Sequence, residues 1–512
     1  MKVVGGIRVS LGSHGSGQWS HRQKYWSEAF IRGPAHSTVR LAMGKQKMAQ
    51  EKAKVLMVSM ALQGHLNPML KFAKRLISKG VHVTLATNDV ARHRMLKHNN
   101  NTPSPNHQED SQTPSIQLEY FSDGLSVDFD RDGDTGTFVN SISTIGSKNL
   151  SALISTLSQT HHYSCVIINP FVPWAVDVAH QHGIPCAVLW IQACALYSIY
   201  YRYFKNIDAF PDLEDPNQIL TLPGLPNLEV RDLPSFMLPS SPPHFKKLLL
   251  RFFEALEKVK WILGASFYEI EEEIVKSMAP LAPIHPIGPL VSPCLLGQND
   301  DVANATSVDM WNAEDSCMEW LDKREARSVV YISFGSIVIL SREEMENMAR
   351  ALRKSEKPFL WVVKKAENGG GEGEEEEITA GGRGLVVRWC EQEKVLMHPA
   401  VGCFVTHCGW NSTVETVVAG VPVIGYPKWT DQATNAKLAR DVFKNGVQVK
   451  YGEDKVASSE EVVRCIREVM EGSKAEEMRK RAMELKEAAK KALQEAGSSD
   501  SNINAFIADL IN

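Results

Sequence analysis

The sequence predicts an α/β protein built from two parallel-sheet domains. Its 512 residues, 43% hydrophobic and 23% charged, suit two globular domains of about 200–250 residues each. Short apolar runs alternate with segments of helical periodicity, first from residue 53 onward and again from residue 328 onward. Alternating strands and helices imply parallel sheets, and two such sheets predict a cleft with ligands at the carboxyl ends of the strands.

The first series of predicted elements begins with the apolar run 53–60, which has the length of a strand. Asn67 can then cap a helix, Pro68 suits its first turn, and Gly80 ends it before a strand over 81–87. The runs 165–169, 173–183 and 185–190 repeat the order strand, helix, strand. We therefore expect a first domain over residues 53–290.

The second series begins with a strand over 328–336. Ser341 and Glu344 form a capping box for a helix through Arg353, and further strands and a helix from Asp431 to Asn445 follow. Residues 291–313 lack periodicity, so we expect them to link the first domain to a second over 314–490. Polar or low-complexity segments at 98–114 and 366–377 are predicted to be surface loops.

Composition excludes several classes of function. The net charge of -4 and the lack of a basic stripe argue against nucleic acid as a partner. No run of about 18 apolar residues predicts a membrane span. Nine scattered cysteines without a CxxC pair favour a reducing compartment such as the cytoplasm, and Cys403, His407 and Cys408 lack the second ligand cluster of a zinc site. The fingerprints GxGxxG after a strand, GxxxxGK[ST] and HExxH are also missing, which argues against dehydrogenases, P-loop enzymes and zinc proteases.

Residues 1–50 stand apart from the rest of the chain. They are rich in Arg, Lys, Ser and Gly, with Glu28 as the only acid. This composition resembles that of an organelle transit peptide, but no clean amphipathic helix is visible. We favour an upstream start codon, with Met43 or Met48 as alternative starts, and expect an extension without fixed structure.

The sequence HCGWNS, residues 407–412, joins an apolar run to a predicted helix. Gly409 allows the backbone to approach a ligand, and the helix that Asn411 and Ser412 open offers free N–H groups to an anion such as a diphosphate. His407 can donate to the same phosphate. Glu415, one turn into the helix, can accept from ribose hydroxyls.

Two further parts complete this window. Trp389 offers a flat face for a base, and Asp431 with Gln432 can bind sugar hydroxyls at the start of another helix. The ordered set in 389–432 resembles the signature segment of plant family 1 glycosyltransferases that use UDP-sugars. The resemblance covers about residues 53–512 and implies the GT-B architecture: two Rossmann-like domains facing a cleft, with a C-terminal helix over 491–512 that crosses back to the first domain.

The resemblance also implies a donor site. Trp389 would stack on uracil, and Glu415 would bind the ribose. The implied donor-binding residues are Ser336, Trp389, Cys390, Gln392, His407, Trp410, Asn411, Ser412, Glu415, Asp431 and Gln432. Gln at position 432 resembles glucose-preferring members, so UDP-glucose is the expected co-substrate. Neither a metal nor another cofactor is expected, because helix N-termini and His407 would offset the diphosphate charge.

His65, in the loop sequence QGHLNP, is the candidate general base. The resemblance implies that it activates the acceptor for attack opposite UDP, which gives a β-glucoside. In many relatives an Asp after a later strand orients this histidine, but the matching residue here is Asn169. A carboxylic acid is already ionised at pH 7, and an Asp would repel it, whereas Asn leaves His65 free to be protonated and attract the anion. The alternative is neutral drift, with another group orienting His65.

The acceptor is predicted on the first domain. Trp174, Trp190 and Gln192 supply an aromatic, weakly polar lining, and the segments around them resemble the plant branch that makes glucose esters of auxin-like and benzoate- or cinnamate-like acids. The first hypothesis is therefore an enzyme that forms such esters, as a cytoplasmic monomer without stable membrane insertion. Glucosylation of phenolic or alcohol hydroxyls is the alternative reaction, and an inactive UDP-sugar-binding protein is the alternative class.

Overall fold

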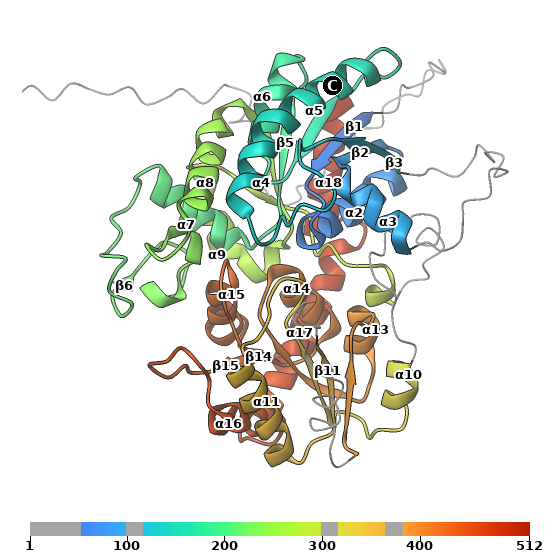
Figure 1. Ribbon diagram of the computed structural model, residues 1–512. Helices are drawn as coiled ribbons and strands as arrows, with labels where there is room; N and C mark the ends of the chain where they lie inside the picture. Colours follow the sequence, from blue (N-terminus) through green and yellow to red (C-terminus); the bar gives the residue numbers. More distant parts are fainter. Residues whose placement is uncertain (1–52, 99–115, 298–315, 364–381, 512) are drawn as a thin grey trace, which may run out of the picture. The chain divides into compact units, whose positions relative to one another are not determined.

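A computed structural model describes residues 53–98, 116–297, 316–363 and 382–511, which form two sheets and the helices around them (Figure 1). The extension 1–50, the loop 366–377 and nearly all of the loop 98–114 lie outside the described residues. Of the expected linker 291–313, only the part up to 297 is described. The domain boundaries stay predictions.

The first sheet has seven parallel strands in the order β3-β2-β1-β4-β5-β8-β9. Its strands are β1 Lys54–Ser59, β2 His82–Asn88, β3 Gln117–Phe121, β4 Cys165–Ile168, β5 Cys186–Trp190, β8 Val259–Gly264 and β9 His285–Pro286. Its helices are α2 Gln63–Ser78, α3 Val90–His98, α4 Thr135–Ser141, α5 Ser147–Leu157, α6 Trp174–Gln181, α7 Cys194–Phe204, α8 Pro243–Ala255 and α9 Tyr268–Met278. Two short strands, β6 Ile219–Leu220 and β7 Leu228–Glu229, pair antiparallel apart from this sheet.

The second sheet has six parallel strands in the order β12-β11-β10-β13-β14-β15. They are β10 Val329–Ser333, β11 Phe359–Val362, β12 Gly384–Val387, β13 Val401–Thr406, β14 Val423–Gly425 and β15 Gly446–Gln448. The helices of this half are α10 Ser316–Leu321, α11 Arg342–Ser355, α13 Gln392–Met397, α14 Trp410–Ala419, α15 Gln432–Leu438, α16 Ser459–Met470 and α17 Ala475–Leu493. The predicted capping box of Ser341 and Glu344 at the start of α11 is confirmed.

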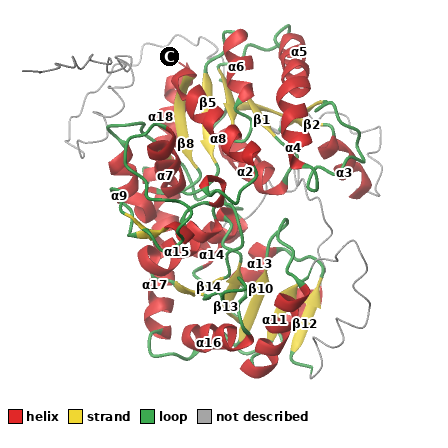
Figure 2. Cartoon of the chain, turned by 60° about the vertical axis from the view of Figure 1, so that its left-hand side comes forward, coloured by secondary structure: helices red, strands yellow, loops and turns green. Residues whose placement is uncertain are grey.

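Helices flank both sheets, so the central strands are buried on both faces (Figure 2). This explains why their sequences are continuous apolar runs rather than alternating ones. The strands β4, β5 and β10 are buried throughout, and Ser333 at the end of β10 is the only polar residue in the three. The strands β1 and β10 lie inside their sheets, and the loops after them therefore open at the carboxyl edges where ligands are expected.

The start of α2 differs from the prediction. The helix begins at Gln63, so Asn67 and Pro68 lie inside it and His65 lies in its first turn. Pro68 has no N–H to donate to the carbonyl of Gly64, four residues earlier. The side-chain amide of Asn411 donates to that carbonyl instead, at 3.2 Å. A contact from the second half of the chain thus offsets the bond that proline removes, which sequence periodicity could not reveal.

The last helix, α18 Ser498–Ile511, contacts elements of the first sheet. Asp500 pairs with Lys79 at 2.5 Å, and the amide of Asn502 donates to the carbonyl of Pro286 at 2.7 Å. The indole N–H of Trp261 in β8 donates to Asp509 at 2.7 Å. These bonds tie the C-terminal helix to the edge of the sheet that β8 and β9 form.

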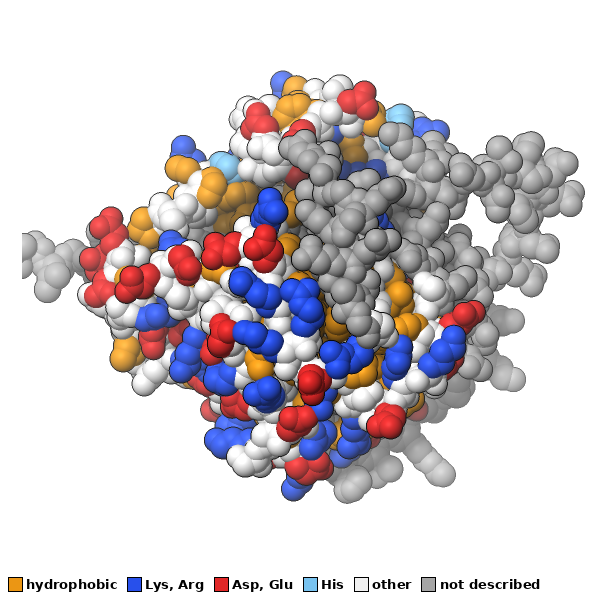
Figure 3. Space-filling view, turned by 60° about the horizontal axis from the view of Figure 1, so that its bottom comes forward, with side chains coloured by type: hydrophobic (Ala, Val, Ile, Leu, Met, Phe, Trp, Pro, Cys, Tyr) orange, Lys and Arg blue, Asp and Glu red, His pale blue; other side chains and the backbone are white. Residues whose placement is uncertain are grey.

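The described surface carries mixed charge. Lys and Arg side chains lie among Asp and Glu on the face that Figure 3 shows. Of the helices in the described part of the chain, none combines the length and the apolar composition that crossing a bilayer requires.

Candidate active site

Residues from both halves of the chain line one cavity of about 1240 Å³. It receives the loops after β1 and β4 from the first sheet and the loops after β10, β12, β13 and β14 from the second. His65, Gln192 and every predicted donor-binding residue line it: Ser336, Trp389, Cys390, Gln392, His407, Trp410, Asn411, Ser412, Glu415, Asp431 and Gln432. Three predicted site residues, Asn169, Trp174 and Trp190, do not.

The turn between β13 and α14 is built to hold an imidazole ring against the backbone. His407 follows the last residue of β13, and Gly409 precedes the first residue of α14. A Cβ atom at Gly409 would lie 2.5 Å from His407 Nε2, and one at Gly335, where φ is +69°, would lie 2.6 Å from His407 Cε1. Only glycine therefore lets both loops close on the ring. Because Gly409 offers no side-chain cap, the N–H groups that open α14 are available to an anion.

A hydrogen-bonded network fixes the residues expected at the ribose. The amide nitrogen of Gln392 donates to Ser412 Oγ at 2.9 Å and to Glu415 Oε2 at 2.8 Å. The Tyr331 hydroxyl donates to Gln392 Oε1 at 3.2 Å, which fixes the orientation of that amide. Lys71 Nζ lies 3.2 Å from Glu415 Oε1. Glu415 is thus held at both oxygens, although burial raises its pKa.

The residues expected at the sugar are held by local bonds. The Trp410 indole N–H donates to the carbonyl of Ala265 at 2.9 Å, so this ring bridges the two halves. Asp431 accepts from the Thr430 hydroxyl at 2.7 Å and from the Asn435 amide at 2.8 Å. Gln432 Oε1 accepts from the N–H of Lys428 at 2.8 Å and leaves its Nε2 for other acceptors. Asp431 and Gln432 open α15, as predicted, although the helical turns end as a π-helix at Phe443.

The Nδ1 atom of His65 has no hydrogen-bond partner among the described residues. Its ring lies 4.5 Å from the ring of Phe171, centroid to centroid. Its Nδ1 is buried and accepts or donates no hydrogen bond within the described structure. Burial lowers the pKa of His65 to about 4, so the ring is neutral at pH 7. Burial therefore disfavours the protonated His65 that was expected from the sequence to attract an anionic acceptor.

Asn169 holds the loop after β4 and does not touch the histidine through a hydrogen bond. It is fully buried one residue beyond β4. Its amide nitrogen donates to Ser59 Oγ at 3.2 Å, and its Oδ1 accepts the N–H of Phe171 at 3.0 Å. The predicted catalytic contact of Asn169 is thus replaced by an indirect one, since Asn169 places the backbone of the residue that packs on His65.

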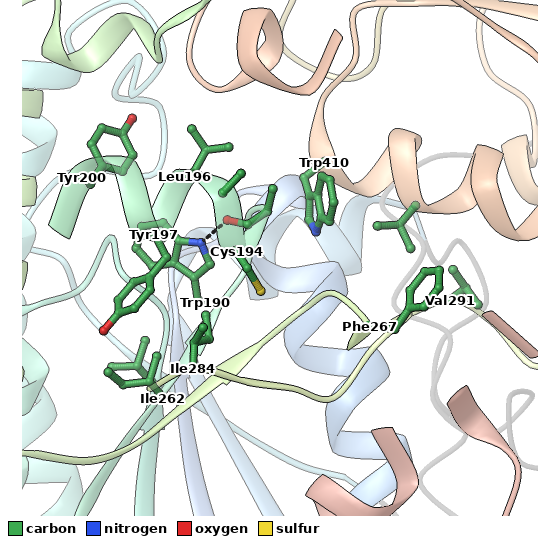
Figure 4. Close-up of a cluster of buried hydrophobic side chains, with 14 of the residues drawn as sticks. Trp190, Cys194, Leu196, Tyr197, Tyr200, Ile262, Phe267, Ile284, Val291 and Trp410 are labelled. Atoms are coloured by element: carbon green, nitrogen blue, oxygen red, sulfur yellow. Dashed lines mark hydrogen bonds between the residues drawn. The ribbon is translucent and has the colours of Figure 1, made fainter. Parts of the chain in front are cut away.

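Trp174 and Trp190 are corrections to the predicted acceptor site. Trp190 is fully buried among Tyr197, Tyr200 and other apolar side chains, and its indole N–H donates to the carbonyl of Ala193 at 2.8 Å (Figure 4). Trp174 opens α6 and meets the ring of Phe121 edge-on at 6.1 Å. Both rings lie in the core because the strand and the helix that carry them are packed on the sheet.

A different set of aromatic residues lines the cavity on the side of His65. Phe171 lies 6.4 Å from Phe236, which stacks on Phe245 at 4.4 Å and meets Trp429 edge-on at 5.9 Å. We call Phe171, Phe236, Phe245 and Trp429 the aromatic wall. Phe171 lies in the segment around Trp174, whose branch resemblance was noted. Its position in the loop after β4, rather than in an apolar run, was the available signal.

Among the residues that the structure covers, no three His, Cys, Asp or Glu side chains converge as metal ligands. All nine cysteines are free, and burial raises the pKa values of the Cys403 and Cys408 thiols. His407 and the start of α14 line the cavity at the turn where the diphosphate is expected.

Known proteins resemble the chain over most of its length. Residues 295–491 match the family model described as "UDP-glucoronosyl and UDP-glucosyl transferase". UDP-glycosyltransferase 84B2 of Arabidopsis thaliana is 49% identical over 89% of this chain and 99% of that protein. Cinnamate beta-D-glucosyltransferase of Fragaria ananassa is 40% identical over 88% of this chain and 82% of its own.

A solved structure, that of Os79 from O. sativa in complex with UDP, superimposes with a TM-score of 0.79. It is 32% identical to this chain and covers 89% of it and 100% of the Os79 chain. Two parallel sheets with a cavity at their carboxyl edges, together with these matches, confirm the predicted GT-B fold. The chain therefore belongs to the plant family 1 UDP-glycosyltransferases.

Proposed function

We propose that the enzyme transfers glucose from UDP-glucose to a small hydrophobic carboxylic acid, with inversion, and so forms a β-glucose ester. The observation that carries this proposal is the environment of His65. Its Nδ1 is buried without a partner in the described structure, and the neighbouring loop presents the amide of Asn169 rather than a carboxylate. The site therefore lacks the group that would stabilise an imidazolium.

Proton transfer then decides which acceptors can react. A phenol has a pKa near 10, and the pKa of His65 is about 4, so moving the proton to the ring costs about 8 kcal/mol. A carboxylic acid with a pKa near 4 has already lost its proton at pH 7. Its carboxylate oxygen attacks the anomeric carbon, and the bond to the UDP oxygen breaks with the electron pair leaving on UDP. No proton needs to move.

A neutral His65 still has a role in this reaction. Because Nδ1 is buried, Nε2 is the nitrogen left to face the cavity. With its proton on Nε2, the ring can donate a hydrogen bond to one oxygen of the acceptor carboxylate while the other oxygen attacks. His65 would then orient the nucleophile, and an Asp in place of Asn169 would place a like charge in the same corner.

The aromatic wall suits the body of the acceptor. Its four rings offer faces and edges to an aromatic or unsaturated skeleton, and Gln192 adds an amide on the same side. The naming of one relative for cinnamate agrees with an acid of this kind. Auxin-like and benzoate-like acids share the same chemistry, an apolar ring with one carboxylate.

The donor would occupy the second half of the cavity. Uracil would stack on Trp389 beside Cys390, the ribose would meet Gln392 and Glu415, and the diphosphate would lie at the start of α14. The remaining proposed donor contacts are Ser336, His407, Trp410, Asn411, Ser412, Asp431 and Gln432. With this arrangement we propose a cytoplasmic, monomeric enzyme that needs no metal.

The test compares cinnamic acid with cinnamyl alcohol, which share one skeleton and differ in the nucleophile. With UDP-glucose we expect a higher kcat/KM for the acid and a product that mild alkali hydrolyses, since esters are labile and ethers are not. Equal or better transfer to the alcohol, giving an alkali-stable product, would favour O-glucosylation of hydroxyls instead. UDP binding without release of UDP in the presence of any acceptor would favour an inactive binding protein.

A further inference from the structure

Lys71 joins the two halves of the chain beside the proposed ribose site. It lies on α2, two turns after His65, and its Nζ is 2.6 Å from Glu393 Oε1 in α13 and 3.2 Å from Glu415 Oε1 in α14. The three side chains are 20%, 17% and 12% exposed, respectively, so water screens these pairs only weakly. No role follows for Lys71 from the signature segment, because it lies outside residues 389–432.

The two carboxylates differ in what else holds them. Glu393 also accepts the backbone N–H of Ser292 at 3.2 Å and the Ser292 hydroxyl. From the described part of the chain, Glu415 accepts only from Lys71 and, at its other oxygen, from the Gln392 amide at 2.8 Å. Among the residues that the structure describes, Lys71 is therefore the only cation that pairs with Glu415, and burial and Glu393 both push this carboxylate toward protonation.

We propose that Lys71 is a positioning residue for the donor, which holds Glu415 ionised and oriented as a double acceptor for the ribose hydroxyls of a uridine diphosphate. Each oxygen of Glu415 has one donor in the protein and a further lone pair for a ligand hydroxyl. A protonated Glu415 would lose that capacity at one oxygen. The inference rests on the proposed donor site and adds the group that keeps its acid charged.

The same contact fixes α2 against α14. The Asn411 amide bonds the carbonyl of Gly64 one residue before His65, and Lys71 bonds Glu415 further along both helices. Lys71 thus belongs to the helix that carries the proposed acceptor-side histidine while it acts on the donor side. Removing the Lys71 side chain should therefore lower the affinity for the nucleotide first.

The test measures the affinities of UDP and 2′,3′-dideoxy-UDP, which lacks both ribose hydroxyls, for the full-length protein by calorimetry. Lys71→Met keeps the length and apolar stem of the side chain and removes its charge. We expect Lys71→Met to weaken UDP binding about tenfold and to change dideoxy-UDP binding by less than about twofold. The reason is that only UDP has ribose hydroxyls that can hydrogen-bond to a charged Glu415. The control is Lys79→Met, which removes the ion pair with Asp500 at the end of the same helix, away from the cavity.

Glu415→Gln provides the second arm. If Lys71 acts through Glu415, adding Lys71→Met to Glu415→Gln should change UDP affinity little further. Equal weakening of both nucleotides by Lys71→Met, or additive losses in the double variant, would overturn the proposal, as would an unchanged affinity for UDP. Should Lys71→Met fail to fold, Lys71→Gln is measured in the same way. Transfer to cinnamic acid by the unaltered enzyme reports separately on the proposed reaction.

Discussion

Asn169→Asp is the substitution that most directly tests why this site would use acids. Asn169 Oδ1 already accepts the N–H of Phe171, and the Ser59 hydroxyl lies 3.2 Å from its other side-chain atom. The first oxygen of an Asp would keep the N–H of Phe171, and the second would gain a donor if the Ser59 hydroxyl turned away from the carbonyl of Met60, to which it now donates at 3.1 Å. Ionised, the Asp adds one negative charge beside the loop whose Phe171 packs on His65, and its side chain has nearly the size of Asn.

The added charge should act in opposite directions on the two kinds of acceptor. It stabilises an imidazolium, so the pKa of His65 should rise from about 4 toward its ordinary value near 6.5, and each unit is worth about 1.4 kcal/mol to a phenol that must give up a proton. Two like charges about 5 Å apart at an effective dielectric of 20 repel by about 3 kcal/mol, which would weaken the binding of a carboxylate about a hundredfold.

The assay is kcat/KM with UDP-glucose for one aromatic acid and one phenol of similar size. We expect the acid-to-phenol ratio to fall at least a hundredfold in Asn169→Asp. Asn169→Ala serves as the control, because it removes the anchor of Phe171 without adding charge and should lower both activities together. An unchanged or higher ratio in Asn169→Asp would show that the uncharged residue has nothing to do with acceptor choice.

Three further predictions follow from the site. The rate of ester formation should be independent of pH between about 6 and 8 and fall toward pH 4, where His65 and the acceptor acid both become protonated. An inflection of kcat/KM near pH 6.5 would contradict a desolvated His65. Gly409→Ala should lower UDP affinity about ten- to hundredfold with little change in the melting temperature, because the new Cβ would lie 2.5 Å from His407 Nε2. Unchanged UDP affinity would argue against a phosphate contact at this turn. Gln432→Glu keeps the oxygen that accepts the N–H of Lys428 but loses the amide donor, so KM for UDP-glucose should rise about tenfold while inhibition by UDP stays the same. Equal weakening of UDP-glucose and UDP binding would place Gln432 outside the sugar site.

Local patterns in the sequence predicted most of the fold. Parallel strands that are buried on both faces must be apolar throughout, so runs such as 53–60 and 328–336 identified β1 and β10 directly. The turn before α14 was predicted in the same way, because the proposed anion site consists of one strand end, one glycine and one helix start that are close in sequence. All the predicted donor residues line the cavity because the segment 389–432 contains nearly all of them.

Such local patterns could not predict contacts between residues that are distant in the sequence. Trp174 and Trp190 look like candidates for a ligand site, but only the packing of α6 and β5 decides that they belong to the core. The aromatic wall joins residues that are far apart in the chain, from Phe171 to Trp429, and no periodicity links them.

Tertiary contacts also decided where α2 begins and which protonation state His65 adopts. The helix runs through Pro68 because Asn411, more than three hundred residues later, bonds the carbonyl that proline leaves unpaired. A histidine in a sequence has an ordinary pKa, whereas the folded chain lowers it to about 4 by burying Nδ1 without a partner. Sequence by itself determined which residues form the proposed donor site, since they are neighbours along the chain. The tertiary structure decided the charge and the surroundings of His65, since desolvation and long-range hydrogen bonds exist only once the two halves meet.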